Sequence, residues 1–298
     1  MKASLDCIPC LVRQALDAAR MVSPDPLVHQ RVLGEMLRWT GEMDMDAPPP
    51  VLGQHFHRWL REITGIGDPY RAAKDRFNRL AVSLLPDLRN TIEAARDPLA
   101  MAVRIAIAGN VIDMGTNGNV TESEVRKSIH EVLTEPPTGI ENGFRQAVTK
   151  AQDILYLADN AGEIAFDRLL IEQLSPPRVT LAVRGSPVIN DATMTDARYV
   201  GLQEIVKIID NGSDAPGTIL EDCSPDFVRR FTEAGLILAK GQGNFETLND
   251  EPRNIFFLFK AKCPVIAAHV GIPVGTYVLT QPGVRLLNSE DSGGGKRC

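Results

Sequence analysis

Hydrophobic positions recur with a helical period through the first half of the chain. An N-terminal helix that starts near Asp6 and Pro9 would carry its apolar residues on one face. These residues are Leu11, Val12, Ala15, Leu16 and Ala19. Further helices are predicted near 26–40, 51–64, 69–85, 98–109 and 121–133. Few segments here are short and rich in β-branched residues, so a helical domain is predicted over residues 1–148.

The pattern changes after residue 148, where short apolar runs are separated by helical or loop segments. The runs predicted to be strands are 154–158, 179–183, 205–209, 236–239 and 276–279. Strands that alternate with helices indicate a parallel sheet with helices on its faces. The sequence therefore predicts the α/β class, with a doubly wound, Rossmann-like domain over 149–288. A disordered tail is expected over 289–298.

Three polar clusters directly follow predicted strands. The first runs from Asp159 to Glu163, the second from Arg184 to Thr193, and the third from Lys240 to Glu246. The carboxyl ends of parallel strands meet at one edge of the sheet, where ligands bind in open α/β folds. Carboxylate and amide oxygens suit Mg²⁺ or Mn²⁺, and a lysine beside glycine-flanked backbone amides suits a phosphate.

Each cluster taken alone also has an ordinary structural interpretation. Asp159-Asn160 before a glycine is common turn chemistry. Asn190-Asp191 is suited to capping a helix, and Lys240 to a solvated loop. Three such clusters at successive strand ends favour a shared site over three unrelated turns.

In the combination and order of these clusters, the chain resembles the metal-dependent damage-control phosphatases. This ARMT-like family was long described as a domain of unknown function. The resemblance covers nearly the whole chain and rests on five segments, 159–163, 189–193, 240–246, 67–70 and 108–113. Cys7-Ile8-Pro9-Cys10 resembles the prokaryotic branch of the family.

The resemblance implies hydrolysis of small phosphate monoesters, often sugar phosphates, with a divalent cation such as Mn²⁺, Co²⁺, Ni²⁺ or Mg²⁺. It implies that Asp159, Asn160 and Asp191 hold this ion at the carboxyl ends of the strands. Members of the family have also been proposed to be carboxyl methyltransferases. An S-adenosylmethionine-dependent carboxyl methyltransferase is therefore an alternative, although the glycine-rich cofactor turn is missing after the first strand. A non-catalytic module that binds metal and sugar phosphate is a second alternative.

The chemistry of phosphate ester hydrolysis suggests a role for each of the candidate site residues. A divalent ion offsets the two negative charges of a phosphate monoester and orients it. Asp159 and Asp191 are expected to be catalytic together with Lys240, which would place a positive charge on the phosphate. The attacking group stays open between a water and an aspartate. Glu163 has two interpretations, an acid or base and an acidic residue in the first turn of a helix.

The helical domain is expected to supply residues that contact the substrate. Asn110 and Asp113 end an otherwise apolar run, and we expect them to contact the substrate with Lys240 and Asn244. A surface-exposed helix end beside Gly115 is the alternative for the first two.

The composition of the chain limits the kinds of partner that the protein is expected to bind. The net charge of -6 gives no general reason to bind nucleic acid or an anionic membrane, and no apolar run is long enough to span a bilayer. The N-terminus shows no export signal. The five cysteines, an odd and mostly scattered set, indicate a reducing cytoplasm. We therefore expect a cytoplasmic protein whose partner is a small phosphorylated metabolite, and the sequence leaves its oligomeric state open.

The motif Cys7-x-x-Cys10 has three interpretations. It could be a redox pair at a helix start, where the helix dipole lowers a thiol pKa. It could be half of a metal site that Cys263 or a histidine completes. The two cysteines could also be small buried apolar residues.

Overall fold

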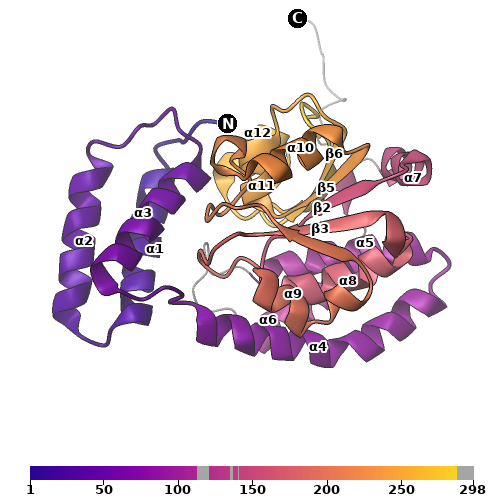
Figure 1. Ribbon diagram of the computed structural model, residues 1–298, viewed down its shortest axis with the longest axis horizontal. Helices are drawn as coiled ribbons and strands as arrows, with labels where there is room; N and C mark the ends of the chain where they lie inside the picture. Colours follow the sequence, from indigo (N-terminus) through magenta and orange to yellow (C-terminus); the bar gives the residue numbers. More distant parts are fainter. Residues whose placement is uncertain (113–120, 135–136, 140, 287–298) are drawn as a thin grey trace, which may run out of the picture.

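The computed structural model describes residues 1–112, 121–134, 137–139 and 141–286, and the fold is a mixed α/β fold with a helical N-terminal portion (Figure 1). The helices before the main strands are α1 (Cys7–Val22), α2 (Pro26–Thr40), α3 (Pro49–Thr64), α4 (Arg71–Ala94), α5 (Pro98–Ala108), η1 (Gly109–Val111), α6 (Glu122–Thr134) and α7 (Glu141–Lys150). The expected fold class is confirmed. No helix in the described part of the chain is long and apolar enough to cross a membrane.

Within the described residues, one sheet contains seven strands in the order β1-β7-β6-β5-β2-β3-β4. The strands are β1 (Thr138–Gly139), β2 (Ile154–Leu157), β3 (Val179–Val183), β4 (Lys207–Asp210), β5 (Leu236–Lys240), β6 (Ile255–Lys260) and β7 (Tyr277–Thr280). The chain runs outward from β2 to β4 and returns to place β5 against the other edge of β2. The strand order therefore reverses between β2 and β5, which is where open α/β sheets bind ligands.

The sheet differs from the sequence prediction in two respects. Strand β6 was not among the predicted strands, and β7 pairs with it in the antiparallel direction, so the sheet is mostly rather than wholly parallel. The two-residue strand β1 lies before residue 148 and pairs with β7. The predicted helical segment thus contributes a short strand to the sheet.

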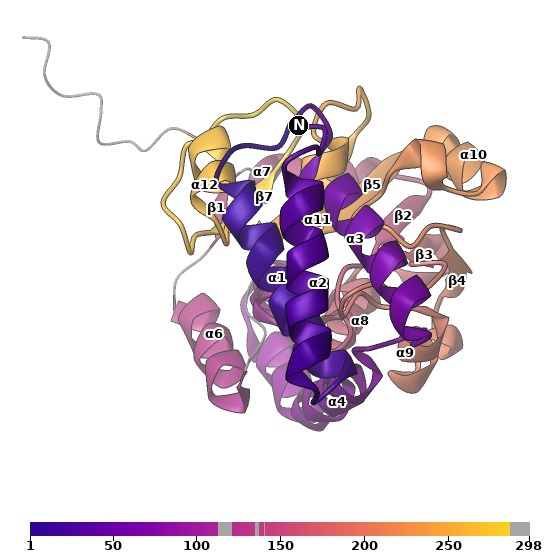
Figure 2. The same cartoon turned by 90° about the vertical axis from the view of Figure 1, so that its left-hand side faces the viewer.

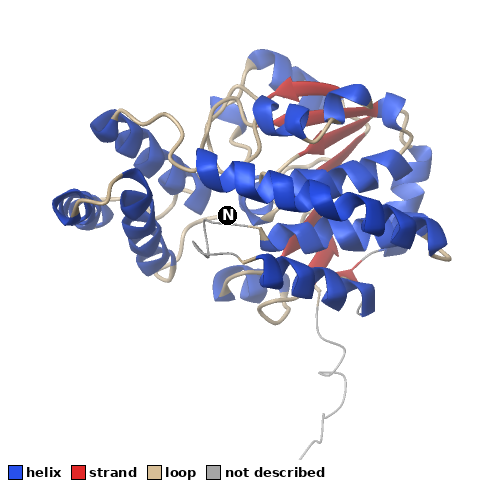
Figure 3. Ribbon diagram, turned by 90° about the horizontal axis from the view of Figure 1, so that it is seen from below, coloured by secondary structure: helices blue, strands red, loops and turns tan. Residues whose placement is uncertain are grey.

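Helices cover both faces of the sheet (Figures 1 and 3). Helices α5 and α8 (Glu163–Gln173) pack on one face, and α4 packs against these two helices. The other face carries α10 (Pro225–Glu233), α11 (Gln242–Leu248) and α12 (Pro264–Val270). Along β5, Leu236 and Leu238 join the first of these cores, and Ile237 and Ala239 join the second. This alternation follows from the two-residue period of a strand.

The boundary predicted near residue 148 stays a prediction. Helices α4 and α5 precede it in sequence yet pack against α8, which follows it. Figure 2 shows α1, α2 and α3 as a separate group in front of the sheet. The tail expected over 289–298 lies outside the described residues.

An ionic contact holds the helical group against the loops that follow the strands. Arg58 of α3 lies 2.6 Å from Asp214, which also pairs with Arg61. Arg61 donates a hydrogen bond of 2.9 Å to the carbonyl of Pro187. These arginines therefore connect α3 to the loops after β3 and β4, which places the helical group over the carboxyl edge of the sheet.

His57 of α3 is buried without charge. Its side chain is 2% exposed, and among the described residues its Nε2 has no hydrogen-bond partner. The rings of Phe56 and Tyr70 pack edge-on against it. Burial, with a smaller contribution from the charge of Arg61, lowers the pKa of His57 to about 3. The imidazole is therefore neutral in the folded protein across the physiological pH range.

We expect this buried histidine to make the fold sensitive to acid. The unfolded chain takes up a proton near pH 6.5, and the folded chain does so only near pH 3, so the free energy of unfolding falls as pH decreases between these values. The slope from His57 approaches about 1.4 kcal/mol per pH unit. Urea unfolding between about pH 6.5 and pH 5 should show a shallower slope in His57→Leu. The exposed His130→Leu should keep the wild-type slope, and equal slopes in both variants would contradict this assignment.

Candidate active site

The loops after β2 and β3 bring Asp159, Asn160 and Asp191 together. The backbones of Asn160 and Asp191 form an isolated antiparallel bridge. The amide of Ala192 donates a 2.7 Å hydrogen bond to the carbonyl of Asp159. Ile189, just before this contact, has a φ of +43°, a costly conformation for a β-branched residue and one that is often found at functional sites. The backbone is thus shaped to present the three side chains side by side.

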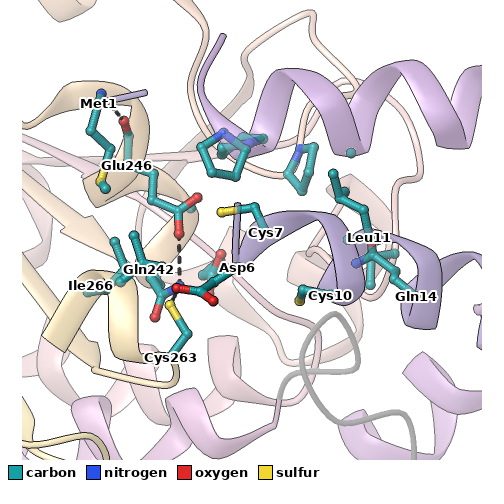
Figure 4. Close-up of a pocket in the computed structure, with 18 of the residues that line it drawn as sticks. Met1, Asp6, Cys7, Cys10, Leu11, Gln14, Gln242, Glu246, Cys263 and Ile266 are labelled. Carbon is teal, nitrogen blue, oxygen red and sulfur yellow. Dashed lines mark hydrogen bonds between the residues drawn. The ribbon is translucent and has the colours of Figure 1, made fainter. Parts of the chain in front are cut away.

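All three side chains line one cavity of about 170 Å³. The strand-end loops and α11 form one wall, and α12 continues it. Helices α1 and α3 form the facing wall, and Figure 4 shows side chains of α1, α11 and α12 around the space. The cavity therefore lies between the helical group and the carboxyl edge of the sheet, beside the point where the strand order reverses.

Arg184 lies beside the carboxylates of Asp191 and Asp159. It follows β3 directly, is 3% exposed, and donates from Nε to Oδ2 of Asp191 at 2.7 Å. Its Nη2 lies 3.8 Å from Oδ1 of Asp159 and 3.3 Å from Oδ1 of Asn244. The sequence prediction did not single out this arginine, although it stands at a strand end in the second polar cluster.

Asn244 was expected to contact substrate, and the structure places it in the layer beneath the cavity. Its side chain is fully buried and accepts from Arg184 and from Thr218 Oγ1, at 2.8 Å from the latter. Its Nδ2 donates to the backbone carbonyl of Lys240 at 2.7 Å. A contact with substrate stays a prediction, and the observed role is to hold Arg184 and the end of β5.

Lys240 does not face the cavity. It shares its face of β5 with Leu236 and Leu238, so its side chain enters the core beneath α5 and α8. Its Nζ donates to the carbonyl of Ala106 at 2.8 Å. It also lies 2.7 Å from Glu163 Oε1 and from Asp167 Oδ1. The interpretation as a solvated loop residue is wrong, because the side chain is 0% exposed.

The buried ion cluster around Lys240 keeps this lysine charged. Its two carboxylate partners raise the pKa of Lys240 far above its ordinary value despite the opposing effect of burial. Burial raises the pKa of Asp167 to about 6, although Lys240 opposes the rise. Contact between Lys240 and a phosphate stays a prediction, and it would require the ammonium to leave all three observed acceptors.

Asn110 was expected to contact the substrate. In the structure its side chain donates a hydrogen bond to Asp159. It lies on η1, is fully buried, and donates from Nδ2 to Asp159 Oδ2 at 2.9 Å and to Glu163 Oε2 at 3.1 Å. Its Oδ1 accepts from the backbone amide of Lys260 at 3.1 Å. Substrate contact by Asn110 stays a prediction. Asp113, the other residue expected there, lies outside the described residues.

Glu163 links the cavity floor to the ion cluster. It is the first residue of α8 and is fully buried. Asn160 donates from Nδ2 to Glu163 Oε2 at 2.9 Å and to Asp159 Oδ2 at 2.7 Å. These two hydrogen bonds fix the side chain of Asn160 beside the carboxylate of Asp159.

The buried group around Asp159 and Lys240 contains more acidic than basic side chains. The acidic side chains are Asp159, Glu163, Asp167 and Asp191, and the basic ones are Arg184 and Lys240. With all six ionised, this group has two more negative than positive charges. A cation bound among these acidic side chains would offset part of their negative charge.

Comparison with known proteins agrees with this geometry. The family model for the damage-control phosphatase ARMT1-like domain matches residues 3–278. The chain belongs to this family. A damage-control phosphatase of Archaeoglobus fulgidus is 34% identical over 284 residues, which cover 93% of this chain and 98% of that protein. One from Pyrococcus horikoshii is 32% identical over 285 residues, with 93% and 97% covered.

The fold of this damage-control phosphatase family member is also found in a solved structure. The crystal structure of a DUF89 family protein from P. horikoshii matches with a TM-score of 0.84 and 30% identity. The match covers 95% of this chain and 99% of that one. The resemblance drawn from the sequence motifs is confirmed, and membership of the damage-control phosphatase family supports a phosphatase activity for this chain.

The cysteine motif of this family member borders the same cavity. Cys7 and Cys10, in the first turn of α1, line it together with Cys263. Cys7 is half-buried and Cys10 is exposed, so the interpretation as two buried apolar residues is wrong. Among the described residues, no group of three or more His, Cys, Asp or Glu side chains is arranged to hold a metal ion, so a thiolate metal site gains no support. A redox role stays a prediction.

Gly241 is the residue that lets Asp159 take its position. Its φ is +81°, and a Cβ at this position would lie 1.9 Å from Oδ2 and 2.1 Å from Cγ of Asp159. Neither atom can tolerate such a contact, so any side chain here must displace the carboxylate. The glycine between β5 and α11 therefore allows the close approach of two strand ends.

Gly241→Ala should accordingly weaken binding of a divalent cation by at least about 10-fold, or ~1.4 kcal/mol. Isothermal titration with Mn²⁺ measures this loss. Gly275→Ala is the matched control, because Gly275 also has a positive φ of +92° but a Cβ there would meet nothing within 4 Å. The control should lose stability from backbone strain and keep its cation affinity. Unchanged affinity in Gly241→Ala would show that the Asp159 carboxylate is not a ligand.

Proposed function

We propose that this chain is a divalent-metal-dependent phosphatase that hydrolyses small phosphate monoesters, sugar phosphates among them. The main observation is that Asp159, Asn160 and Asp191, from two adjacent strand ends, line one cavity above the buried acids Glu163 and Asp167. Membership of the damage-control phosphatase family gives the reaction class. The metal dependence and the substrate class are our inference from the site.

The donor set fits a hard divalent ion. Two carboxylates and one carboxamide supply oxygen ligands of the kind that Mg²⁺ and Mn²⁺ prefer, and Co²⁺ or Ni²⁺ also accept them. Only two of these three donors, Asp159 and Asp191, are of the His, Cys, Asp or Glu type. This agrees with the finding that no group of three or more such side chains among the described residues is arranged to hold a metal ion. We propose that Asp159, Asn160 and Asp191 hold the ion and that phosphate and water complete its coordination.

A bound divalent ion would supply charge that offsets and orients the phosphoryl group. The protein's own residues keep the donors in place. Arg184 fixes Asp191, and Asn110 fixes Asp159, each through a hydrogen bond to Oδ2. Lys240 pairs with Glu163 and Asp167 below them and so offsets part of the negative charge beneath the proposed ion site.

Release of inorganic phosphate from a panel of small phosphate monoesters tests the proposal. Release is expected with at least one of Mn²⁺, Co²⁺, Ni²⁺ and Mg²⁺, and excess chelator should stop it. Full activity in chelator would overturn the metal dependence, and no release from any monoester with any ion would overturn the phosphatase assignment. Nothing in the described residues favours the methyltransferase or the non-catalytic alternative.

A further inference from the structure

The described residues that line the cavity include acidic side chains and no basic ones. Among the described residues that line it, Asp6, Asp159, Asp191 and Glu246 are acidic, and none is lysine, arginine or histidine. A cationic group on one of these described lining residues is the α-ammonium of Met1. It donates to the carbonyl of Glu246 at 2.9 Å and lies 3.5 Å from the exposed carboxylate of Asp250. Two of the four acids, Asp6 and Glu246, have no part in the proposed ion site.

Helix α11 sets the distance between Glu246 and the proposed ion site. Gly241 touches the carboxylate of Asp159, and α11 starts at the next residue. Gln242 and Glu246 both line the cavity and are four residues apart, which is about 6 Å along a helix. Glu246 therefore lines the cavity about one helical turn beyond Gln242, outside the proposed ion site.

Neighbouring groups hold the Glu246 carboxylate in position. Gln242 donates from Nε2 to Glu246 Oε1 at 2.8 Å and accepts at Oε1 from the backbone amide of Lys262 at 3.0 Å. Glu246 itself is only 7% exposed. Asp6 occupies the N-cap position of α1, yet its side chain makes no capping hydrogen bond. Figure 4 shows Asp6, Gln242 and Glu246 around the same part of the pocket.

We propose that Asp6 and Glu246 form a charge-selective wall that admits monophosphates whose leaving alcohol carries no second negative charge. A carboxylate or a second phosphate on the alcohol would face these acids with no basic side chain on the described wall to offset it. Repulsion from the buried Glu246 is stronger in a partly enclosed cavity than in water, and the exposed Asp6 adds a smaller contribution. Alcohol hydroxyls, in contrast, donate hydrogen bonds to carboxylates. This inference rests on the proposed phosphatase function.

The test compares two substrates that differ at one carbon, glycerol 3-phosphate and 3-phosphoglycerate. The metal-loaded wild-type enzyme should favour glycerol 3-phosphate in kcat/KM by at least about 10-fold. Glu246→Gln should reduce this preference at least about 3-fold, mainly through a lower KM for 3-phosphoglycerate. Asp6→Asn, at an exposed position where folding is not at risk, should act in the same direction.

Glu233→Gln is the matched control, since it removes one negative charge from an exposed position of α10 and should leave the preference unchanged. A wild-type enzyme that hydrolyses both compounds equally well, or a preference that neither Glu246→Gln nor Asp6→Asn alters, would overturn the charge-selective wall and leave the phosphatase proposal standing. Absence of phosphate release from every monoester in the panel would instead overturn the proposed function itself, and this inference with it.

Discussion

Replacing Asp159 or Asp191 by asparagine should lower kcat/KM for phosphate release by at least about 1000-fold, or ~4 kcal/mol of transition-state stabilisation. Asparagine keeps the size of the side chain and, at position 191, an oxygen that can still accept from Arg184 at the observed place. Only the charge that would hold the cation is removed. Steady-state assays with Mn²⁺ measure the loss.

Thermal unfolding distinguishes a variant that no longer binds the ion from one that no longer folds. Mn²⁺ should raise the unfolding temperature of the wild type, because a ligand of the folded state stabilises it, and should do so little or not at all for Asp159→Asn and Asp191→Asn. Without metal, Asp159→Asn should stay close to the wild type in stability, whereas Asp191→Asn should lose some, because the buried Arg184 then has a neutral partner in place of a carboxylate. Asp226→Asn, at an exposed site of α10, should behave like the wild type in both assays. Substantial activity in Asp159→Asn would contradict its assignment as a ligand.

Lys240→Met should destabilise the protein by about 3–5 kcal/mol, because it leaves Glu163 and Asp167 buried beside each other without their shared cation. The methionine fills a similar volume, so little of the loss would come from packing. Urea unfolding measures the change. Lys207→Met, at an exposed position of β4, is the matched control and should stay within about 0.5 kcal/mol of the wild type.

The same variant distinguishes two roles for Lys240. If its ammonium contacted the phosphate, as the sequence suggested, Lys240→Met would lose about 100-fold in kcat/KM with little loss of stability. A variant as stable as the wild type would therefore contradict the structural role. A second substitution, Asp167→Asn, should recover part of the lost stability in the Lys240→Met background, because it removes one of the two charges left unpaired.

The strands next to the site could be predicted because they are short, continuous apolar runs. Strands β2, β3 and β5 are buried on both faces, and the polar residues that follow them mark their carboxyl ends. Parallel pairing of these strands then predicts that Asp159, Asn160 and Asp191 lie at one edge of the sheet. Strand β6, an equally apolar run of Phe and Leu, carried the same signal and was missed.

The direction of a side chain at a strand end could not be predicted in the same way. Residues two apart in a strand share a face, so Lys240 lies on the same face of β5 as Leu236 and Leu238. The sequence alone does not indicate which face of β5 packs against α5 and α8. Likewise, the partner of Asn110 depends on how η1 packs over α8, a contact between segments about fifty residues apart. The antiparallel direction of β7 depends on which edge of the sheet it joins.

The most direct test of the proposed ion site is an anomalous difference map from crystals soaked in Mn²⁺. The account predicts one dominant peak in the cavity, about 2.1 Å from carboxylate oxygens of Asp159 and Asp191 and from the amide oxygen of Asn160. The same soak of Asp191→Asn crystals should show the peak strongly reduced. A peak between Cys7 and Cys10, or none at this strand edge under saturating Mn²⁺, would contradict the account.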